Sequence, residues 1–210
     1  MTTRYHHGNL RAALIEAAAG LARSGGPDAV VLREVARTVG VSHNAAYRHF
    51  ADREEVLAEV GELAMAQLEQ AMLDGMAEVR ARDPRKRARE RLAATGRAYV
   101  TYALTNPGLF TVAFAGATKH DADAQAHDEA GSGGPYGVLN SVLDELVEVG
   151  AMPAARRPSA DFTCWSGVHG YAELHLSGTP NGIMAPVDPA LWGAGLEHLL
   201  EVLDRGLTAG

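Results

Sequence analysis

One short stretch of the sequence, which reads SHNAAYRH from Ser42 onward, gathers polar side chains suited to contact with nucleic acid. Three of them can hydrogen-bond base edges or phosphates, namely His43, Asn44 and Arg48. Two more suit phosphate oxygens, whose contacts fix register without reading sequence: Tyr47 and His49. The small side chains between them, Ala45 and Ala46, let a backbone approach the bases. This stretch predicts a surface that reads DNA.

The flanking residues predict the helices that would present this surface. Leu32, Val35, Ala36 and Val39 recur at helical spacing until Gly40 ends the pattern. Ser42 is a suitable N-cap for a second short helix that ends at Phe50. Two short helices around a tight Gly-Val-Ser turn have the geometry of a helix-turn-helix, whose second helix enters the major groove. The alternative is an ordinary solvated helical hairpin.

Charge divides the chain in the same place. The whole sequence has a formal charge of −7, whereas residues 1–50 carry six arginines against three acids and four of the nine histidines. The asymmetry predicts an anion-binding head on an acidic body. We expect a three-helix DNA-binding domain at residues 1–52 and a ligand-binding and dimerisation domain at residues 53–210.

Helical periodicity continues through the rest of the chain. An Ala-rich first helix is expected from Asn9 to about Ala22, and Asp52 with Glu55 forms a capping box for a long helix. Residues 116–134 lack apolar periodicity and are expected to form a mobile loop or a partly helical excursion. The fold class is all-α with about nine helices, the later ones expected at residues 84–105, 138–149, 160–176 and 189–207 and a short apolar turn at 109–114.

The sequence resembles the TetR family of transcriptional regulators over residues 6–60. The matching motifs are His-Gly-Asn-Leu, then Leu-Arg-Glu-Val-Ala before Val-Gly-Val-Ser, then Tyr-Arg-His-Phe-Ala-Asp-Arg-Glu-Glu-Val-Leu. The resemblance implies DNA-facing positions at Arg33, Thr38, His43, Asn44, Ala45, Tyr47, His49 and Arg53. It makes Tyr47, His49 and Arg53 the phosphate binders. It also implies a homodimeric repressor that a small molecule releases from double-stranded operator DNA.

A second motif, Trp-Ser-Gly-Val-His-Gly from Trp165, resembles the C-terminal signature of one TetR subgroup, and Tyr-His-His-Gly from Tyr5 is typical of the same subgroup. Between the long helices, apolar side chains with a few polar groups could line a cavity for an apolar or aromatic effector. The lining is expected to include Met72, Met76, Tyr99, Tyr102, Phe110, Phe114, Trp165 and His169. A filled core is the alternative.

The last two helices carry more apolar surface than a body of this size can readily cover. We therefore expect a two-fold dimer with a four-helix interface. Its contacts are expected at Trp165, Leu176, Trp192, Leu196, Leu199 and Leu203. The alternative is that both helix faces pack within one chain.

Other functions have less support in the sequence. An enzyme would need a nucleophile with its base, paired carboxylates or a phosphate loop, and no G-x-S-x-G, GxGxxG, Walker A or HExxH motif occurs. An architectural DNA-binding protein would not need so large an acidic body. A metal-sensing regulator is the stronger rival, with ligands from Cys164, His169 and His175 or from His120, Asp121, Asp123, His127 and Asp128. The leading interpretation needs no metal and no cofactor.

The single cysteine and the N-terminal sequence bear on the compartment. One cysteine cannot form an internal disulfide, and MTTRYHHGNL has no apolar signal region. No apolar run approaches the length that a membrane-spanning helix requires. A cytoplasmic protein without a membrane partner is expected.

Overall fold

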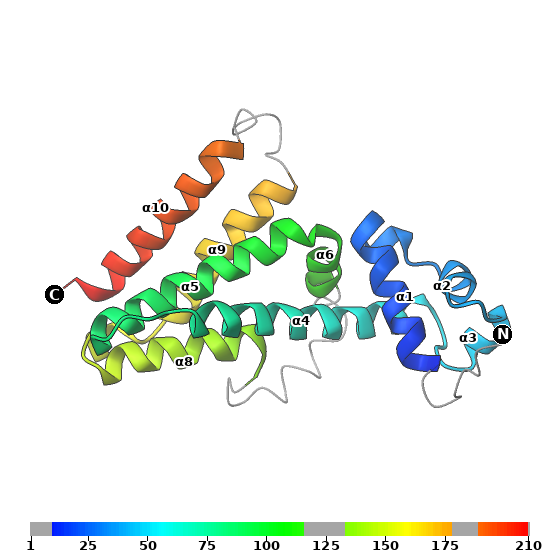
Figure 1. The fold of residues 1–210 in the computed structure, drawn as a ribbon, viewed down its shortest axis with the longest axis horizontal. Coiled ribbons are helices and arrows are strands. Elements are labelled where there is room, and N and C mark those ends of the chain that lie inside the picture. Colours follow the sequence, from blue (N-terminus) through cyan, green and yellow to red (C-terminus); the bar gives the residue numbers. More distant parts are fainter. Residues whose placement is uncertain (1–9, 116–132, 178–188, 210) are drawn as a thin grey trace. The chain divides into compact units, whose positions relative to one another are not determined.

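The computed structural model describes residues 10–115, 133–177 and 189–209, with side chains from residue 193 onward in the last range. Its described part is helical throughout (Figure 1), which confirms the all-α prediction. The helices are α1 (Leu10–Gly25), α2 (Leu32–Val39), α3 (His43–Tyr47), α4 (Arg53–Ala77), α5 (Pro84–Thr105), α6 (Pro107–Ala115), α8 (Gly134–Glu148), α9 (Ala160–Leu176) and α10 (Pro189–Thr208). Short 3-10 turns lie at Pro27–Ala29 (η2) and Ala154–Arg156 (η4). The loop predicted at residues 116–134 lies almost wholly outside the described residues.

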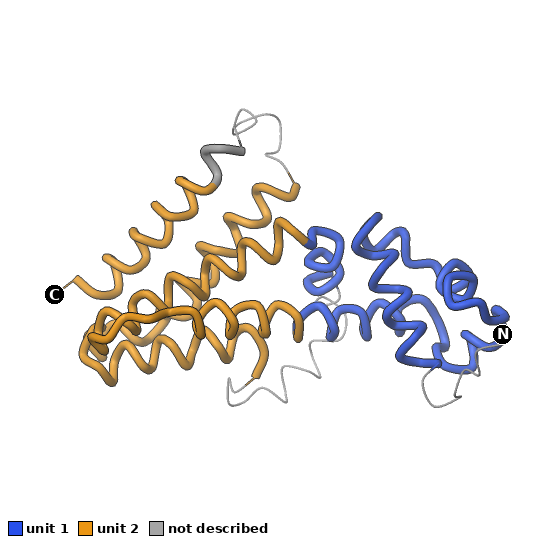
Figure 2. The backbone as a smooth tube through the Cα atoms, viewed as in Figure 1, with its two compact units in different colours: residues 1–65, 106–127 blue, residues 66–105, 128–210 orange. Residues whose placement is uncertain are grey.

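The chain divides into two compact units, shown in Figure 2. The head unit comprises residues 1–65 and 106–127, and the body unit comprises residues 66–105 and 128–210. The head therefore includes the first half of α4 and all of α6, beyond the boundary at residue 52 that the sequence indicates. Whether residues 1–52 and 53–210 act as separate functional domains stays a prediction.

Local signals explain where the head helices begin and end. Gly40 adopts φ 77° and ψ 29°, and its N–H closes α2 on the carbonyls of Ala36 and Arg37. This left-handed conformation favours glycine, which has no Cβ to clash. At the start of α4, Asp52 accepts a hydrogen bond from the N–H of Glu55 at 2.9 Å. Glu55 accepts in return from the N–H of Ala51 at 2.7 Å. The predicted capping box is therefore present, except that Glu55 bonds to the residue before Asp52 instead of to Asp52 itself.

The head core brings α1, α2, α3, α4 and α6 together. Apolar side chains from these helices bury one another, including Leu14, Val35, Ala46, Phe50 and Val56. Helix α6, where a short apolar turn is expected from the sequence, adds Leu109 and Val112 to the same cluster. Gly108 makes this possible, because a Cβ there would lie 1.9 Å from the carbonyl oxygen of Ala22 on α1.

The body unit is built around α5, which contacts α8, α9 and α10. Its fully buried side chains include Tyr99, Leu143 and Leu146. Helix α9 begins after Ser159, which has φ 65° although it is not a glycine. No described helix is both long and apolar enough to cross a membrane.

Candidate nucleic-acid interface and apolar cavity

Helix α3 has one face in the head core and one face in solvent. Ala46 is fully buried and Phe50, just beyond the helix, is 1% exposed. Ser42 caps α3, because its side chain accepts a hydrogen bond from the N–H of Ala45 at 3.2 Å. The core contacts and the cap fix which side chains of this helix face outward.

The exposed face carries most of the predicted DNA contacts. Its members on and around α2 and α3 are Arg33, Thr38, Ser42, His43, Asn44, Tyr47 and Arg48, while Ala45, His49 and Arg53 are half-buried. The rings of His43 and Tyr47 meet edge to face at 4.5 Å between centroids, so each side chain orders the other. Because these polar groups project from a short, well-anchored helix, they can reach groove and backbone together.

Arg53 is held by the head itself. Its Nε donates to the carbonyl oxygen of Val30 at 2.8 Å, and Nη2 donates to that of Pro27 at 2.6 Å. Nη2 also lies 3.6 Å from a carboxylate oxygen of Asp28. The guanidinium thus fastens the start of α4 to the segment between α1 and α2. A phosphate contact by Arg53 stays a prediction.

Arg11 occupies a central position that sequence reasoning missed. Its Nη1 donates to the carbonyl oxygen of His49 at 2.7 Å, directly after α3. The same guanidinium pairs with Glu59 and Glu55 on α4 and lies 4.4 Å from the ring centroid of Phe50. No motif marks this residue, because its partners are 38 or more positions away along the chain.

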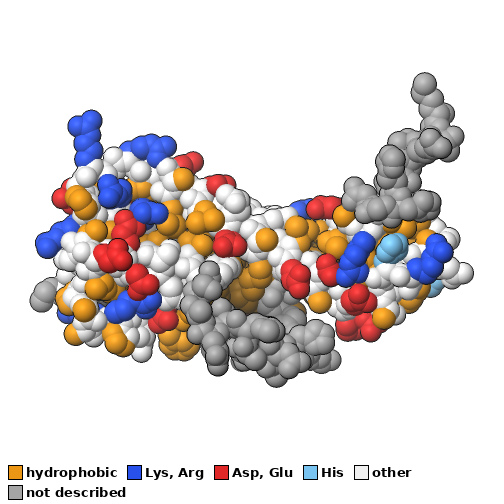
Figure 3. Space-filling model, turned by 90° about the horizontal axis from the view of Figure 1, so that it is seen from below, with side chains coloured by type: hydrophobic (Ala, Val, Ile, Leu, Met, Phe, Trp, Pro, Cys, Tyr) orange, Lys and Arg blue, Asp and Glu red, His pale blue; other side chains and the backbone are white. Residues whose placement is uncertain are grey.

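Charges are mixed on the surface of the head. Figure 3 shows basic and histidine side chains on this unit with acidic side chains among them. A surface of this kind does not attract DNA by bulk charge alone, so individual hydrogen bonds and phosphate contacts must supply much of the affinity.

Substitutions on α3 should separate base reading from phosphate binding. We expect His43→Ala and Asn44→Ala to change base preference, each by about 1–3 kcal/mol at the affected position. Tyr47→Phe should instead weaken binding to all sequences alike, because a phosphate contact carries no base information. Fluorescence anisotropy with cognate and scrambled duplexes at several salt concentrations measures both effects. Equal losses on both duplexes would remove His43 and Asn44 from the base-reading set.

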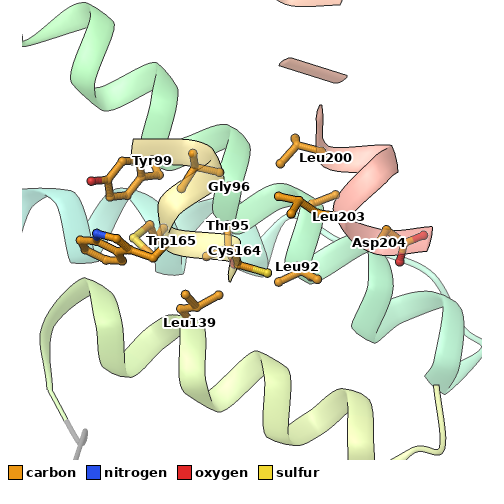
Figure 4. Close-up of a pocket in the computed structure, with 13 residues that line it drawn as sticks. Leu92, Thr95, Gly96, Tyr99, Leu139, Cys164, Trp165, Leu200, Leu203 and Asp204 are labelled. Carbon is orange, nitrogen blue, oxygen red and sulfur yellow. The ribbon is translucent and has the colours of Figure 1, made fainter. Parts of the chain in front are cut away.

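The body unit encloses an apolar cavity of about 30 Å³. Its lining comes from α4, α5, α8, α9 and α10, and Figure 4 shows the main side chains. The lining residues are Met72, Leu92, Ala93, Thr95, Gly96, Tyr99, Leu139, Cys164, Trp165, Val168, Leu200, Leu203 and Asp204. Ligand pockets usually measure about 300–1,000 Å³, so this cavity is too small to hold a ligand in the present conformation, and in this sense it is closed.

Polar groups around the cavity are engaged elsewhere. The hydroxyl of Tyr99 and Nδ1 of His169 share a hydrogen bond of 2.8 Å, and the hydroxyl of Thr95 donates to the carbonyl of Arg91 at 2.8 Å. In Figure 4 the phenol oxygen of Tyr99 and the indole nitrogen of Trp165 lie away from Leu200 and Leu203. Burial raises the pKa of the Tyr99 phenol and raises the pKa of the Cys164 thiol to about 11, so both groups are neutral at pH 7. The cavity therefore suits an uncharged apolar group.

The structure brings together only some of the residues expected at a ligand site. Met72, Tyr99 and Trp165 line the cavity. Met76, Tyr102 and His169 belong to the same unit but not to this lining. Phe110 and Phe114 lie on α6 in the head unit, with ring centroids 4.7 Å apart. Ligand contacts by these residues stay predictions.

The predicted dimer contacts are largely used within one chain. Leu196 is 8% exposed, Trp165 and Leu203 line the cavity, and Leu199 lies against Gly167. Leu176 is half-buried, and the side chain of Trp192 lies outside the described residues. Three other apolar side chains project from α9 and α10 into solvent: Phe162 at 70%, Leu174 at 49% and Val202 at 50% exposure.

The described residues do not support the metal-sensing alternative. Among them, no three His, Cys, Asp or Glu side chains are close enough together to hold a metal ion. Cys164, His169 and His175 therefore do not form such a group. The other set, at residues 120–128, lies outside the described residues.

Family models match both parts of the chain. Residues 14–60 match the model of bacterial regulatory proteins of the tetR family, and residues 92–201 match the tetracyclin repressor-like C-terminal domain. Among proteins of curated function, none matches the sequence significantly.

Solved structures share the fold over almost the whole chain. A protein of unknown function from a Rhodococcus species is 26% identical with a TM-score of 0.79, covering 99% of this chain and 100% of its own. The TetR family regulator PfmR from Thermus thermophilus is 20% identical with a TM-score of 0.58, covering 91% and 97%. A TetR family regulator from Marinobacter aquaeolei is 18% identical with a TM-score of 0.60, covering 94% of each chain.

Proposed function

This chain belongs to the TetR family of DNA-binding transcriptional regulators, and we propose that it is a homodimeric repressor released from its operator by a small apolar effector. The observation that carries the proposal is the pairing of an exposed polar α3 face in the head with a closed apolar cavity in the body. Regulators of this family are generally not enzymes, and we propose no catalytic activity for this one. A regulator that binds operator DNA must share its compartment, so we propose a cytoplasmic location.

In the proposed DNA complex, α3 enters the major groove. His43 and Asn44 read base edges, with Arg48 beside them, while Tyr47, His49 and Arg53 contact phosphates. Arg33, Thr38, Ser42 and Ala45 complete the surface. Exposure of the α3 face supports these assignments, and so does the anchoring of α3 by Ala46 and Phe50.

Dimerisation is proposed through α9 and α10. Exposed Phe162, Leu174 and Val202 support this, because apolar side chains that remain in solvent on adjacent helices need a cover. A two-fold axis would pair the same face of two copies and form a four-helix interface. Of the contacts expected from the sequence, Leu196 is buried within one chain, so we propose the three exposed side chains as the centre of the interface.

The effector is proposed to bind the body cavity and to favour a conformation that DNA does not. Because the cavity is closed, an effector must open it, which couples binding to a change in the arrangement of the body helices. Linkage then requires that operator DNA weaken effector binding by the same factor by which effector weakens DNA binding, corresponding to about 1–3 kcal/mol.

The direct test begins with the operator. Selection of duplexes from a random pool by the purified protein should yield a two-fold symmetric sequence. Apolar compounds are then screened for those that raise the melting temperature, and each hit is tested for release of the selected duplex. Hits that stabilise the protein without weakening DNA binding would contradict effector-controlled release. A pool without any enriched sequence would contradict base reading by α3.

Filling the cavity should separate effector binding from DNA binding. Cys164 is 4% exposed and lines the cavity, so Cys164→Leu should occupy the space and abolish the melting shift caused by a hit. Operator affinity should stay within about twofold, because the head is unchanged. Cys164→Ser is the matched control and should keep the shift. A full shift in Cys164→Leu would place the effector elsewhere.

A further inference from the structure

A surface groove of about 440 Å³ runs between α5 and α10 of the body unit. Its rim is charged, and its floor is apolar where Ala93 and Leu200 lie. Ala93, Leu200 and Asp204 also line the internal cavity, so the groove and the cavity share one wall. These three side chains lie between the groove and the apolar cavity.

Leu200 is the main apolar side chain in the shared wall. It is 6% exposed and packs directly over Gly96 of α5. A Cβ at position 96 would lie 2.6 Å from Cδ2 of Leu200, so the leucine fills a space that only glycine leaves open. Leu203, one turn further along α10, sits over Gly167 of α9 in the same way, because a Cβ at position 167 would lie 3.3 Å from Cδ1 of Leu203.

Two ion pairs join α10 to α5 on either side of Leu200. Arg97 makes a two-pronged contact with Glu197, with N–O distances of 2.6 Å and 2.7 Å. Arg89 contacts Asp204 in the same manner, with its Nε 2.9 Å from Oδ1. The Arg97 pair lies on the N-terminal side of Leu200 and the Arg89 pair on the C-terminal side. Both pairs therefore act across the groove at the level of the wall.

The two ion pairs stabilise the closed arrangement less than the packing of the apolar core does. The side chains of Arg97 and Glu197 are 46% and 54% exposed; that of Arg89 is 47% exposed, and its partner Asp204 is 17% exposed. Exposed ion pairs stabilise proteins only slightly, because water screens them and long side chains lose freedom. Parting α10 from α5 breaks these two ion pairs and uncovers Leu200, and it also requires α10 to shift against α9, where Leu203 covers Gly167.

We propose that the groove between α5 and α10 is the entrance to the cavity, that Leu200 closes it, and that the Arg89–Asp204 and Arg97–Glu197 pairs hold it shut. The entrant is an uncharged apolar molecule. The proposal rests on the proposed effector site and adds its route of access. Charged molecules are disfavoured because the lining offers no unpaired partner for a buried charge.

The chain's one cysteine provides a direct measure of opening. Cys164 lines the cavity beyond Leu200 and is 4% exposed, so a reagent reaches its thiol only when a wall opens. The probe is methyl methanethiosulfonate, a small uncharged thiol reagent, added to the full chain at fixed pH and followed by mass spectrometry. No effector and no DNA are needed, so failure of this test is distinct from failure of the proposed regulation.

Breaking the Arg89–Asp204 and Arg97–Glu197 pairs should speed the labelling of Cys164. We expect a rate about fivefold higher in the Glu197→Gln, Asp204→Asn double variant, as two weak surface pairs together would give. Leu200→Ala should speed labelling further, because it removes the closing side chain. The matched control is Glu34→Gln, which removes the Glu34–Arg37 pair within α2 of the head unit and should leave the rate unchanged.

A second control tests the other wall. Tyr136 of α8 donates a hydrogen bond to Asp161 of α9 at 2.7 Å, and Tyr136→Phe removes it. Faster labelling in Tyr136→Phe than in the double variant would overturn the proposal and place the entrance beside α8. Equal acceleration in Glu34→Gln would also overturn it. Labelling that follows the free energy of unfolding across all variants would show that the cavity opens only by global unfolding, which contradicts a local entrance.

Discussion

Gly108→Ala is expected to unfold the head unit and abolish operator binding. A Cβ at this position would lie 1.9 Å from the carbonyl oxygen of Ala22 and 3.2 Å from Cα of Gly26. Both neighbours are backbone atoms, so no side chain can rotate to relieve the contact. Overpacking of a core typically costs about 1–3 kcal/mol, and we expect the upper end of this range or more. Urea unfolding followed by circular dichroism measures the loss.

A glycine on α1, the helix that Gly108 of α6 contacts, provides the control. A Cβ at Gly20 would meet no atom within 4 Å. Gly20→Ala should therefore raise the free energy of unfolding by up to about 1 kcal/mol, the difference in helix propensity. Wild-type stability in Gly108→Ala would show that α6 does not press on α1 as closely as the structure has it.

Charge introduced on the exposed faces of α9 and α10 should separate the proposed dimer. Phe162→Lys combined with Val202→Lys replaces two of the most exposed apolar side chains with like charges that would meet across a two-fold axis. We expect a monomer in light scattering. Operator affinity should fall about 100-fold or more, because two linked heads bind two half-sites as one event.

Leu73→Lys is the control for that experiment. Leu73 is 40% exposed but belongs to α4, which carries none of the proposed interface residues. The variant should remain a dimer with normal operator affinity. If the double lysine variant also remained a dimer at micromolar concentration, the interface would have to lie on another surface.

Local signals made most of the fold predictable. Gly40, the Ser42 cap and the Asp52 capping box act through neighbours within a few residues, so the sequence alone locates the helix ends that they set. Apolar periodicity likewise identified α9 and α10. The place of α6 in the head was not predictable, because the contact of Gly108 with Ala22 joins positions far apart in the chain.

It was harder to predict whether an apolar side chain packs within the chain or faces solvent. Periodicity shows that a helix has an apolar face but not which neighbour covers it, so Leu196 and Leu203 were expected at a dimer interface although one is buried and the other lines the cavity. Val202, beside Leu203 in sequence, points to solvent instead. The cavity itself depends on how Leu200 fits over Gly96, which no pattern in the sequence records.

The guanidinium of Arg11 has a mechanical consequence. It joins α1, the first turns of α4 through Glu55 and Glu59, and the carbonyl of His49 at the end of α3. Tilting α3 alone would break the charge-assisted hydrogen bond from Arg11 to His49 and separate the Phe50 ring from the guanidinium, so Arg11 holds α3 against α1 and α4. In the proposed dimer, release from DNA would then follow from a change in the distance between two undistorted heads, which must match operator half-sites about 34 Å apart. On this proposal, the spacing of the operator half-sites selects one separation of the heads, and regulation changes that separation.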